Sequence, residues 1–244
     1  MHILYLGNFL NNVKGHYDGP NVQVVKILKN QGHQLSKAGG SGSKILRLLQ
    51  FISTILKGKT QKVDLIIIDV FSTNAFYFPV ISAMLARSLK MKYALVLHGG
   101  NLPQRFKSSS KLSSSLLKRA ALISSPSNYL ASAAKSLFDV KVKVIPNRID
   151  VQLKDLDLKR ENTLYWVRSL SSIYNPEMAV EVLRLITEAG LDFKLVFIGP
   201  GNVERIKDVK KLGSQYELQH KIDIKGKMTR AEWHNLARNG KYFL

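Results

Sequence analysis

The chain has 244 residues, 45% apolar and 22% charged, which is the composition of an ordinary soluble globular protein large enough for two lobes. It contains no cysteine, which excludes a disulfide framework and a thiolate metal site and fits a reducing compartment. The net charge of +20 is concentrated in residues 1–138, where 18 Lys and Arg face only three acids. Such an excess favours a polyanionic partner, which charge alone leaves open as an anionic membrane surface, a nucleic acid or a phosphorylated substrate.

The first part of the chain alternates between strand and helix patterns. Near-continuous apolar runs, typical of strands buried on both faces of a parallel sheet, occupy residues 3–6, 65–68, 93–97, 122–125 and 143–145. Helical patterns cover residues 23–31, 76–89 and 127–137. This β-α-β-α alternation predicts an α/β fold with a doubly wound sheet.

Three further stretches of the first lobe have less regular patterns. Residues 36–43 are rich in Gly and Ser and are expected to form a loop. Residues 44–59 carry apolar side chains at helical spacing with lysines and Arg47 around them, which fits either a helix packed on its own sheet or an interfacial helix. Residues 108–115, with the sequence SSSKLSSS, are expected to form a solvated loop, with phosphate binding as the alternative.

A second run of the same pattern begins after a charged connection at residues 151–160, which places the boundary between lobes near residue 150. Strands are expected at residues 164–167, 194–198 and 222–224, with a further strand beginning at Tyr242. Helices are expected at residues 176–189, 203–212 and 230–238. The sequence therefore predicts two Rossmann-like lobes, 1–150 and 151–244, of which the second is incomplete.

The apolar runs are far shorter than the roughly 20 residues that a membrane-spanning helix requires. Residues 2–6 read as a strand without a basic leader or a small-residue cleavage site, so no signal peptide is expected. The expected location is the cytoplasm.

The candidate ligand-binding residues follow the predicted strands, at the edge where open α/β sheets bind ligands. Neither a Walker A loop nor a G-x-G-x-x-G turn follows the first strand, which disfavours simple nucleotide hydrolases and dehydrogenases. The strand-end groups that remain are Gly15-His16, His98-Gly99-Gly100-Asn101, Ser125-Pro126-Ser127, Pro146-Asn147, Arg168 and Gly199-Pro200-Gly201.

In this order, these groups resemble family 4 glycosyltransferases of the GT-B fold, retaining enzymes that transfer a sugar from a nucleotide-sugar donor. The resemblance covers nearly the whole chain. It rests on four pieces: Gly32-His33, His98-Gly99, Val144-Ile145-Pro146-Asn147, and Trp166-Val167-Arg168 followed by Phe197-Ile198-Gly199-Pro200-Gly201. The segment Ile173-Tyr174-Asn175-Pro176 looks like a subgroup in which I-Y-N-P replaces the commoner lysine-glycine.

For the second lobe, the resemblance implies a donor site. Arg168 matches the family's diphosphate-binding arginine, and a guanidinium beside a departing diphosphate would stabilise its developing charge. The alternative role for Arg168 is a surface salt bridge. Asn175, Gly199, Gly201 and Met228 are the other expected donor-binding residues, although the glycines also fit a tight turn and Met228 also fits plain packing.

For the first lobe, the resemblance places His98 beside the donor sugar as the expected catalytic histidine, which orients the sugar. Gly15, His16 and Gly99 are expected on the acceptor side. No cofactor and no metal site are expected, because the sequence has no cluster of carboxylates or of His and Asp.

The resemblance also defines what lies beyond residue 244 in the family: an acidic motif whose glutamates hold the donor's sugar and ribose. If the polypeptide ends at residue 244, donor binding should be severely weakened. The expected acceptor is a lipid-linked or cell-surface glycan, and the basic first lobe suits the anionic inner membrane leaflet. The alternatives are a non-catalytic binding module derived from such an enzyme and, less favoured because no RNA or DNA motif is present, a nucleic-acid-binding protein.

Overall fold

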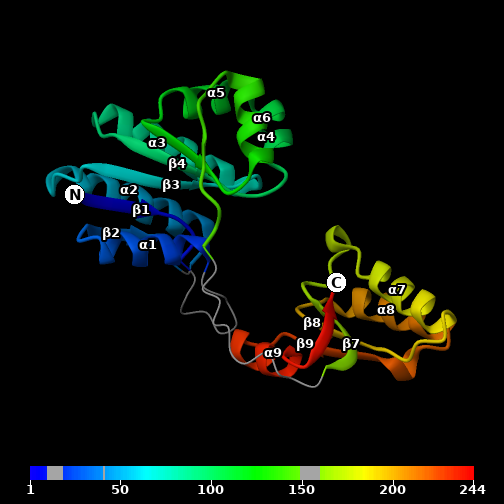
Figure 1. The fold of residues 1–244 in the computed structure, drawn as a ribbon. Helices are drawn as coiled ribbons and strands as arrows, with labels where there is room; N and C mark the ends of the chain where they lie inside the picture. Colours follow the sequence, from blue (N-terminus) through cyan, green and yellow to red (C-terminus); the bar gives the residue numbers. More distant parts are fainter. Residues whose placement is uncertain (10–18, 41, 149–159) are drawn as a thin grey trace. The chain divides into compact units, whose positions relative to one another are not determined.

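The computed structural model describes residues 1–9, 19–40, 42–148 and 160–244 (Figure 1). The chain divides into two compact units, Met1–Asp150 (unit 1) and Val151–Leu244 (unit 2). The expected connection at residues 151–160 lies, except for Arg160, outside the described residues. Each unit has its own sheet and its own hydrophobic core.

Unit 1 is built on a six-stranded sheet in which all strand pairs are parallel, in the order β2-β1-β3-β4-β5-β6. Its strands are β1 (His2–Leu6), β2 (Gln34–Ala38), β3 (Leu65–Val70), β4 (Tyr93–Leu97), β5 (Leu122–Ser125) and β6 (Lys143–Val144). The strand order reverses direction at β1 and β3. In open α/β sheets, ligands bind outside the carboxyl ends of the strands at such a reversal.

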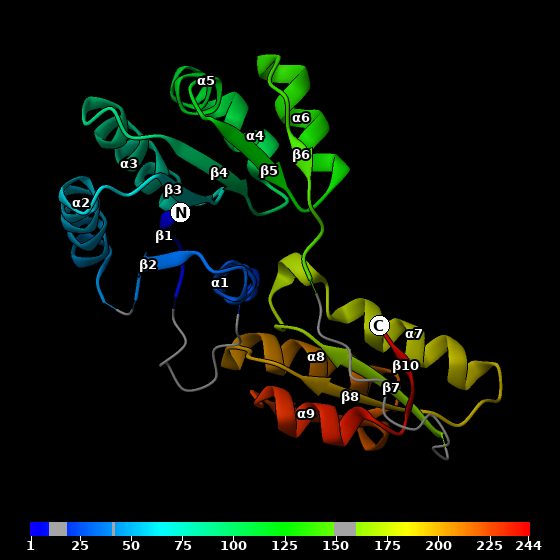
Figure 2. The ribbon, with the colours of Figure 1, turned by 60° about the vertical axis from the view of Figure 1, so that its left-hand side comes forward.

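Helices cover both faces of this sheet (Figure 2). The helices are α1 (Pro20–Asn30), α2 (Lys44–Thr60), the short η1 (Asn74–Phe76), α3 (Tyr77–Ser88), α4 (Leu102–Ser108), α5 (Ser110–Lys118) and α6 (Asn128–Phe138). Because side chains alternate along a strand, Leu4 and Leu6 of β1 enter the large core under α2 to α6. Tyr5, between them, points to the opposite face and packs against Val22 and Val25 of α1.

Of two expected loops of unit 1, one begins later than predicted and the other is wrong. Part of the Gly/Ser-rich stretch at residues 36–43 belongs to β2, an edge strand that pairs in register with β1. Residues 108–115 are mainly helical, since Ser108 ends α4 and residues 110–115 belong to α5. Leu116 and Leu117 are buried in the core and anchor α5 there.

Unit 2 has a four-stranded parallel sheet in the order β10-β7-β8-β9. Its elements are β7 (Glu161–Val167), η2 (Ser172–Tyr174), α7 (Glu177–Glu188), β8 (Lys194–Ile198), α8 (Val203–Gln215), η3 (Gln219–Lys221), β9 (Ile222–Gly226), α9 (Arg230–Ala237) and β10 (Gly240–Phe243). The main core lies between the sheet, α7 and α8. A smaller cluster under α9 covers the other face.

The predicted fold class is confirmed: both units are α/β, with parallel sheets covered by helices on both faces. Within the part of the chain that the structure describes, no helix is long and apolar enough to cross a membrane.

Candidate functional site

The carboxyl edge of the unit 1 sheet holds a buried carboxylate that connects two strands. Asp69, the fifth residue of β3, is almost fully enclosed, and its Oδ1 atom accepts a hydrogen bond of 2.9 Å from the Tyr5 hydroxyl. The Nε2 atom of His98, which directly follows β4, lies 3.0 Å from the same oxygen. Because an ionised carboxylate only accepts hydrogen bonds, this contact places a proton on Nε2 of the His98 ring.

Burial and the neighbouring carboxylate both act on Tyr5. Burial raises the pKa of the Tyr5 hydroxyl, and the negative charge of Asp69 and their hydrogen bond raise this pKa further. Tyr5 therefore remains a hydrogen-bond donor at physiological pH. Asp69 is fixed from two sides, and through it the orientation of the His98 ring is fixed as well.

The loop after β3 completes the surroundings of His98. The Phe71 ring stacks on the His98 ring at a centroid distance of 5.3 Å. The loop itself is held by Arg105 of α4, whose Nε donates a 2.8 Å hydrogen bond to the Ser72 carbonyl. Gly99 has a φ of +97°, a conformation that strongly favours glycine, so the turn after His98 depends on this residue.

A cavity of about 430 Å³ opens at this edge, where β1 and β3 meet the N-terminal part of α2. Its walls come from the ends of β1, β3 and β4, from α2 and from the start of α3: Gly7, Asn8, Arg47, Phe51, Asp69, Phe71, Ser72, Thr73, Ala75, Phe78, Pro79 and Gly99. The volume is in the range of small-molecule sites, and the cavity lies at the reversal of strand order. The structure thus brings Gly99 to one cavity wall, and His98 adjoins the cavity through Asp69. Gly15 and His16, the other expected acceptor-side residues, lie outside the described residues.

The corresponding edge of unit 2 carries an exposed cation. Arg168 directly follows β7, and its guanidinium lies over the Tyr174 ring at 5.4 Å from the ring centroid. Among the residues that the structure describes, no carboxylate forms a salt bridge with Arg168. The alternative of a surface salt bridge therefore has no support there, and the guanidinium remains available for an anionic ligand.

The two glycines expected at the donor site hold the ends of β7 and β8 together. A Cβ atom on Gly199 would lie only 2.0 Å from the Arg168 carbonyl oxygen. Gly201 is similarly restricted, since a Cβ there would lie 3.2 Å from atoms of Leu170 and Ile206. The Leu170 amide donates to the Pro200 carbonyl at 2.9 Å. The missing side chains thus allow a close backbone contact that fixes the position of Arg168.

Arg205, in the first turn of α8, ties this loop to both helices that begin at the edge. Its guanidinium pairs with Glu177 at the start of α7 and with Asp208 at 3.1 Å. Its Nε also donates to the Leu170 carbonyl at 3.4 Å. Both helices begin at the edge that carries Arg168, where the positive ends of their dipoles favour an anion.

The remaining two expected donor-binding residues occupy different environments. Asn175 is exposed next to Tyr174 and ends η2 in the left-handed conformation, with φ of 53°. Met228 follows β9 and is half-buried against the small cluster under α9, where Trp233 and Val196 also pack. Asn175 thus adjoins the Arg168 loop and Met228 packs under α9, and donor binding by either residue stays a prediction.

Sequence reasoning missed several residues of these two edges: Tyr5, Arg47, Asp69, Phe71 and Tyr174. Asp69 had a usable signal, since it is an acid within an apolar strand and one of only three acids in residues 1–138. In the described parts of the chain, no group of three or more His, Asp or Glu side chains is arranged to hold a metal ion.

No protein-family model and no curated protein matches this sequence. Solved structures are similar in fold. HepE from Anabaena, in complex with UDP, aligns over 100% of this chain and 73% of its own with a TM-score of 0.66 and 13% identity. A glycosyltransferase from Rickettsia africae aligns over 99% of this chain and 72% of its own (TM-score 0.60, 14% identity). The lipopolysaccharide outer core galactosyltransferase WaaB aligns over 100% and 73%, with a TM-score of 0.59 and 11% identity.

These alignments extend over both units and establish the GT-B fold for this chain. At such low identity they establish the fold and nothing finer. The expected fold is therefore confirmed, and the chain corresponds to about three quarters of the length of these structures.

Proposed function

We propose that the protein is a glycosyltransferase, of the retaining family 4 type, that transfers a sugar from a nucleotide-sugar donor to a lipid-linked or cell-surface glycan. The observation that carries the proposal is the edge of unit 2, where Arg168 lies against Tyr174 without a carboxylate partner among the described residues. The GT-B fold supports it, and HepE was crystallised with UDP and with UDP-glucose.

In the proposed reaction, the donor's diphosphate lies at the edge of unit 2 between Arg168 and the start of α8. Cleavage of the glycosidic bond leaves negative charge on the diphosphate, and a guanidinium held in place before the reaction stabilises that charge at little reorganisation cost. The contact of Gly199 with the Arg168 carbonyl and the ion pair of Arg205 with Glu177 hold the loop in place. With Arg168 supplying the positive charge, we expect transfer to proceed without a metal ion.

His98 is proposed to orient the donor sugar rather than to transfer a proton. With its Nε2 hydrogen directed to Asp69, the neutral form of the ring would present Nδ1 as an acceptor for a sugar hydroxyl. Asp69 and Tyr5 then act as positioning residues, because they set the ring's tautomer and direction.

The proposed place of action is the cytoplasmic face of an anionic membrane, where a lipid-linked acceptor would be found. On α2, Phe51 and Ile55 face the core, whereas a second row of apolar side chains remains exposed: Ile45, Leu46, Leu49 and Leu56. Ile45 alone is 73% exposed. Lysines at both ends of the helix and the basic excess of unit 1 complement anionic lipid, to which each basic residue near the surface adds about 1 kcal/mol.

Liposome sedimentation tests the membrane part. The protein should sediment with anionic vesicles and remain in the supernatant with neutral ones, and Leu49→Glu should weaken sedimentation. The matched control is Tyr129→Glu, which changes an equally exposed side chain of α6. Equal sedimentation with both kinds of vesicle would contradict the proposal.

Turnover tests the enzymatic part. A panel of UDP- and GDP-sugars should include at least one donor that the protein hydrolyses or transfers, and Arg168→Ala should abolish that turnover. Absence of turnover, together with tight binding of a glycan, would instead indicate a non-catalytic module.

A further inference from the structure

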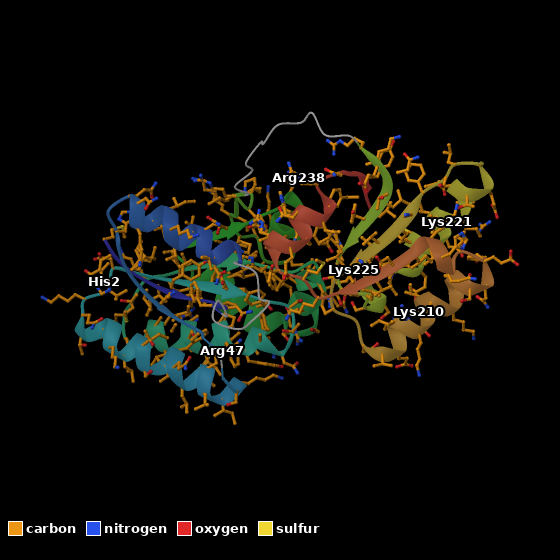
Figure 3. All side chains as sticks on the ribbon, turned by 90° about the horizontal axis from the view of Figure 1, so that it is seen from below. His2, Arg47, Lys210, Lys221, Lys225 and Arg238 are labelled. Carbon is orange, nitrogen blue, oxygen red and sulfur yellow. The ribbon has the colours of Figure 1, made fainter. Side chains whose placement is uncertain are left out.

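The cavity of unit 1 is large enough for a small molecule and is lined by aromatic, carboxylate and cationic side chains. Phe51, Phe71 and Phe78 supply aromatic surface, and Asp69 supplies a carboxylate at the ends of the strands. Arg47 of α2, labelled in Figure 3, is the only cation among the lining residues that the structure describes. A ligand that fits all three walls has an apolar face, hydroxyl groups and an anionic group.

Arg47 is the expected contact for the anionic group of the ligand. Its Nε atom is enclosed and has no hydrogen-bond partner among the residues that the structure describes. Arg47 forms no salt bridge with Asp69, although both line the cavity. The Arg47 guanidinium lines the cavity without an ion pair among the described residues, so an anionic group in the cavity would supply its missing partner. The planar guanidinium matches the oxygens of a phosphate or a carboxylate.

Asp69 is the expected hydrogen-bond acceptor for the hydroxyl groups of the ligand. One of its oxygens already accepts hydrogen bonds from Tyr5 and His98, and its other oxygen lies beside Gly7, where a Cβ atom would approach it to 2.4 Å. A carboxylate acceptor favours a hydroxyl donor over a second anion. The nearby loop is already fixed by Arg105, so binding requires little ordering of this wall.

We propose that this cavity binds an anionic sugar, with its phosphate or carboxylate group at Arg47, its hydroxyls at Asp69 and a face of the ring against the phenylalanines. The inference rests on the proposed function and deepens it, since it makes the acceptor a glycan whose reacting end carries an oxyanion. Arg47 is then a specificity-determining residue, because a neutral sugar leaves its guanidinium without an anionic partner.

Calorimetric titration of the full chain, without donor, tests the inference. Four ligands are compared at one ionic strength: glucose 1-phosphate, glucuronate, glucose and inorganic phosphate. We expect at least one anionic sugar to bind about tenfold or more tightly than both glucose and inorganic phosphate, as hydrogen bonds to charged groups usually provide. Preference for glucose 1-phosphate would identify a phosphorylated acceptor, and preference for glucuronate a uronic acid.

Variants of α2 separate this site from general charge attraction. Arg47→Met should weaken binding of the preferred sugar about tenfold to hundredfold, and Arg47→Lys, which keeps the charge but not the planar fork, should fall between. Lys57→Met removes the same charge from the same helix at a residue that does not line the cavity, and it should leave affinity within about twofold. Circular dichroism verifies that each variant is folded.

Several outcomes would overturn the inference: glucose binding as tightly as both anionic sugars, inorganic phosphate binding as tightly as the preferred sugar, or Lys57→Met weakening binding as much as Arg47→Met. A parallel titration with UDP keeps this inference apart from the proposed function. UDP binding without anionic-sugar binding refutes only the cavity assignment, whereas anionic-sugar binding without any nucleotide binding refutes the glycosyltransferase proposal.

Discussion

Replacing Asp69 with leucine should destabilise unit 1 selectively. The substitution removes the oxygen that accepts hydrogen bonds from the Tyr5 hydroxyl at 2.9 Å and from His98 at 3.0 Å. The enclosed Tyr5 hydroxyl and the largely buried His98 ring then lose their acceptor, and each orphaned group costs about 1–3 kcal/mol, so we expect a loss of about 2–6 kcal/mol. This is a large fraction of the roughly 5–15 kcal/mol that stabilises an ordinary domain.

The positions of the tryptophans allow this effect to be localised. The chain has two, Trp166 in β7 and Trp233 in α9, and both lie in unit 2. Urea unfolding followed by circular dichroism reports both units, whereas tryptophan fluorescence reports unit 2. Asp69→Leu should move the unit 1 part of the dichroism transition to lower urea and leave the fluorescence midpoint unchanged.

Asp64→Leu is the matched control, because Asp64 is exposed just before the same strand and bonds the His2 amide at 2.7 Å. Its cost should stay below about 1 kcal/mol, as at most surface sites. The reasoning would be refuted if Asp69→Leu cost no more than Asp64→Leu, or if it shifted the fluorescence midpoint as far as the dichroism midpoint.

Three further predictions follow from the two edges. Gly199→Ala should shift the fluorescence midpoint to lower urea and weaken UDP binding, because its Cβ would overlap the Arg168 carbonyl. Gly190→Ala is the control, since Gly190 also has a positive φ but open space around it. It should lower the free energy of unfolding by only about 1–2 kcal/mol and leave UDP binding intact. The raised pKa of Tyr5 means that the unfolded chain loses this proton first, so the free energy of unfolding should fall as pH rises above the ordinary tyrosine value of about 10. Tyr5→Phe should make that alkaline decline shallower in urea titrations, and an unchanged slope would contradict the assignment. Chelation of divalent metals by EDTA should leave UDP affinity within about twofold if Arg168 supplies the charge at the diphosphate.

Most strands were predictable because parallel strands buried on both faces appear as continuous apolar runs. The expected strands 93–97 and 194–198 coincide with β4 and β8. The strand β2 was not predicted, because it is an edge strand whose sequence, QLSKA, is largely polar. The helices α4 and α5 were not predicted either, because their serine-rich sequence resembles a loop. Only the structure shows that Leu116 and Leu117 pack into the core and hold α5 there.

The candidate site was predictable where its residues follow strands. His98 and Arg168 were identified in this way, and the structure places each at the carboxyl edge of its sheet. Asp69 and Arg47 required three-dimensional information. Asp69 reads as one more residue of a buried strand, and Arg47 reads as a flanking cation of an amphipathic helix, until the fold brings both to one cavity.

The central claim is that the edge of unit 2 binds a nucleoside diphosphate through Arg168. Calorimetric titration of the full chain with UDP and GDP tests this claim most directly, with Arg238→Ala, an exposed arginine that ends α9, as the control (Figure 3). We expect binding of at least one of the two, weakened about tenfold to hundredfold by Arg168→Ala and unchanged by Arg238→Ala. Binding of neither nucleotide, or equal affinity in the wild type and Arg168→Ala, would contradict it.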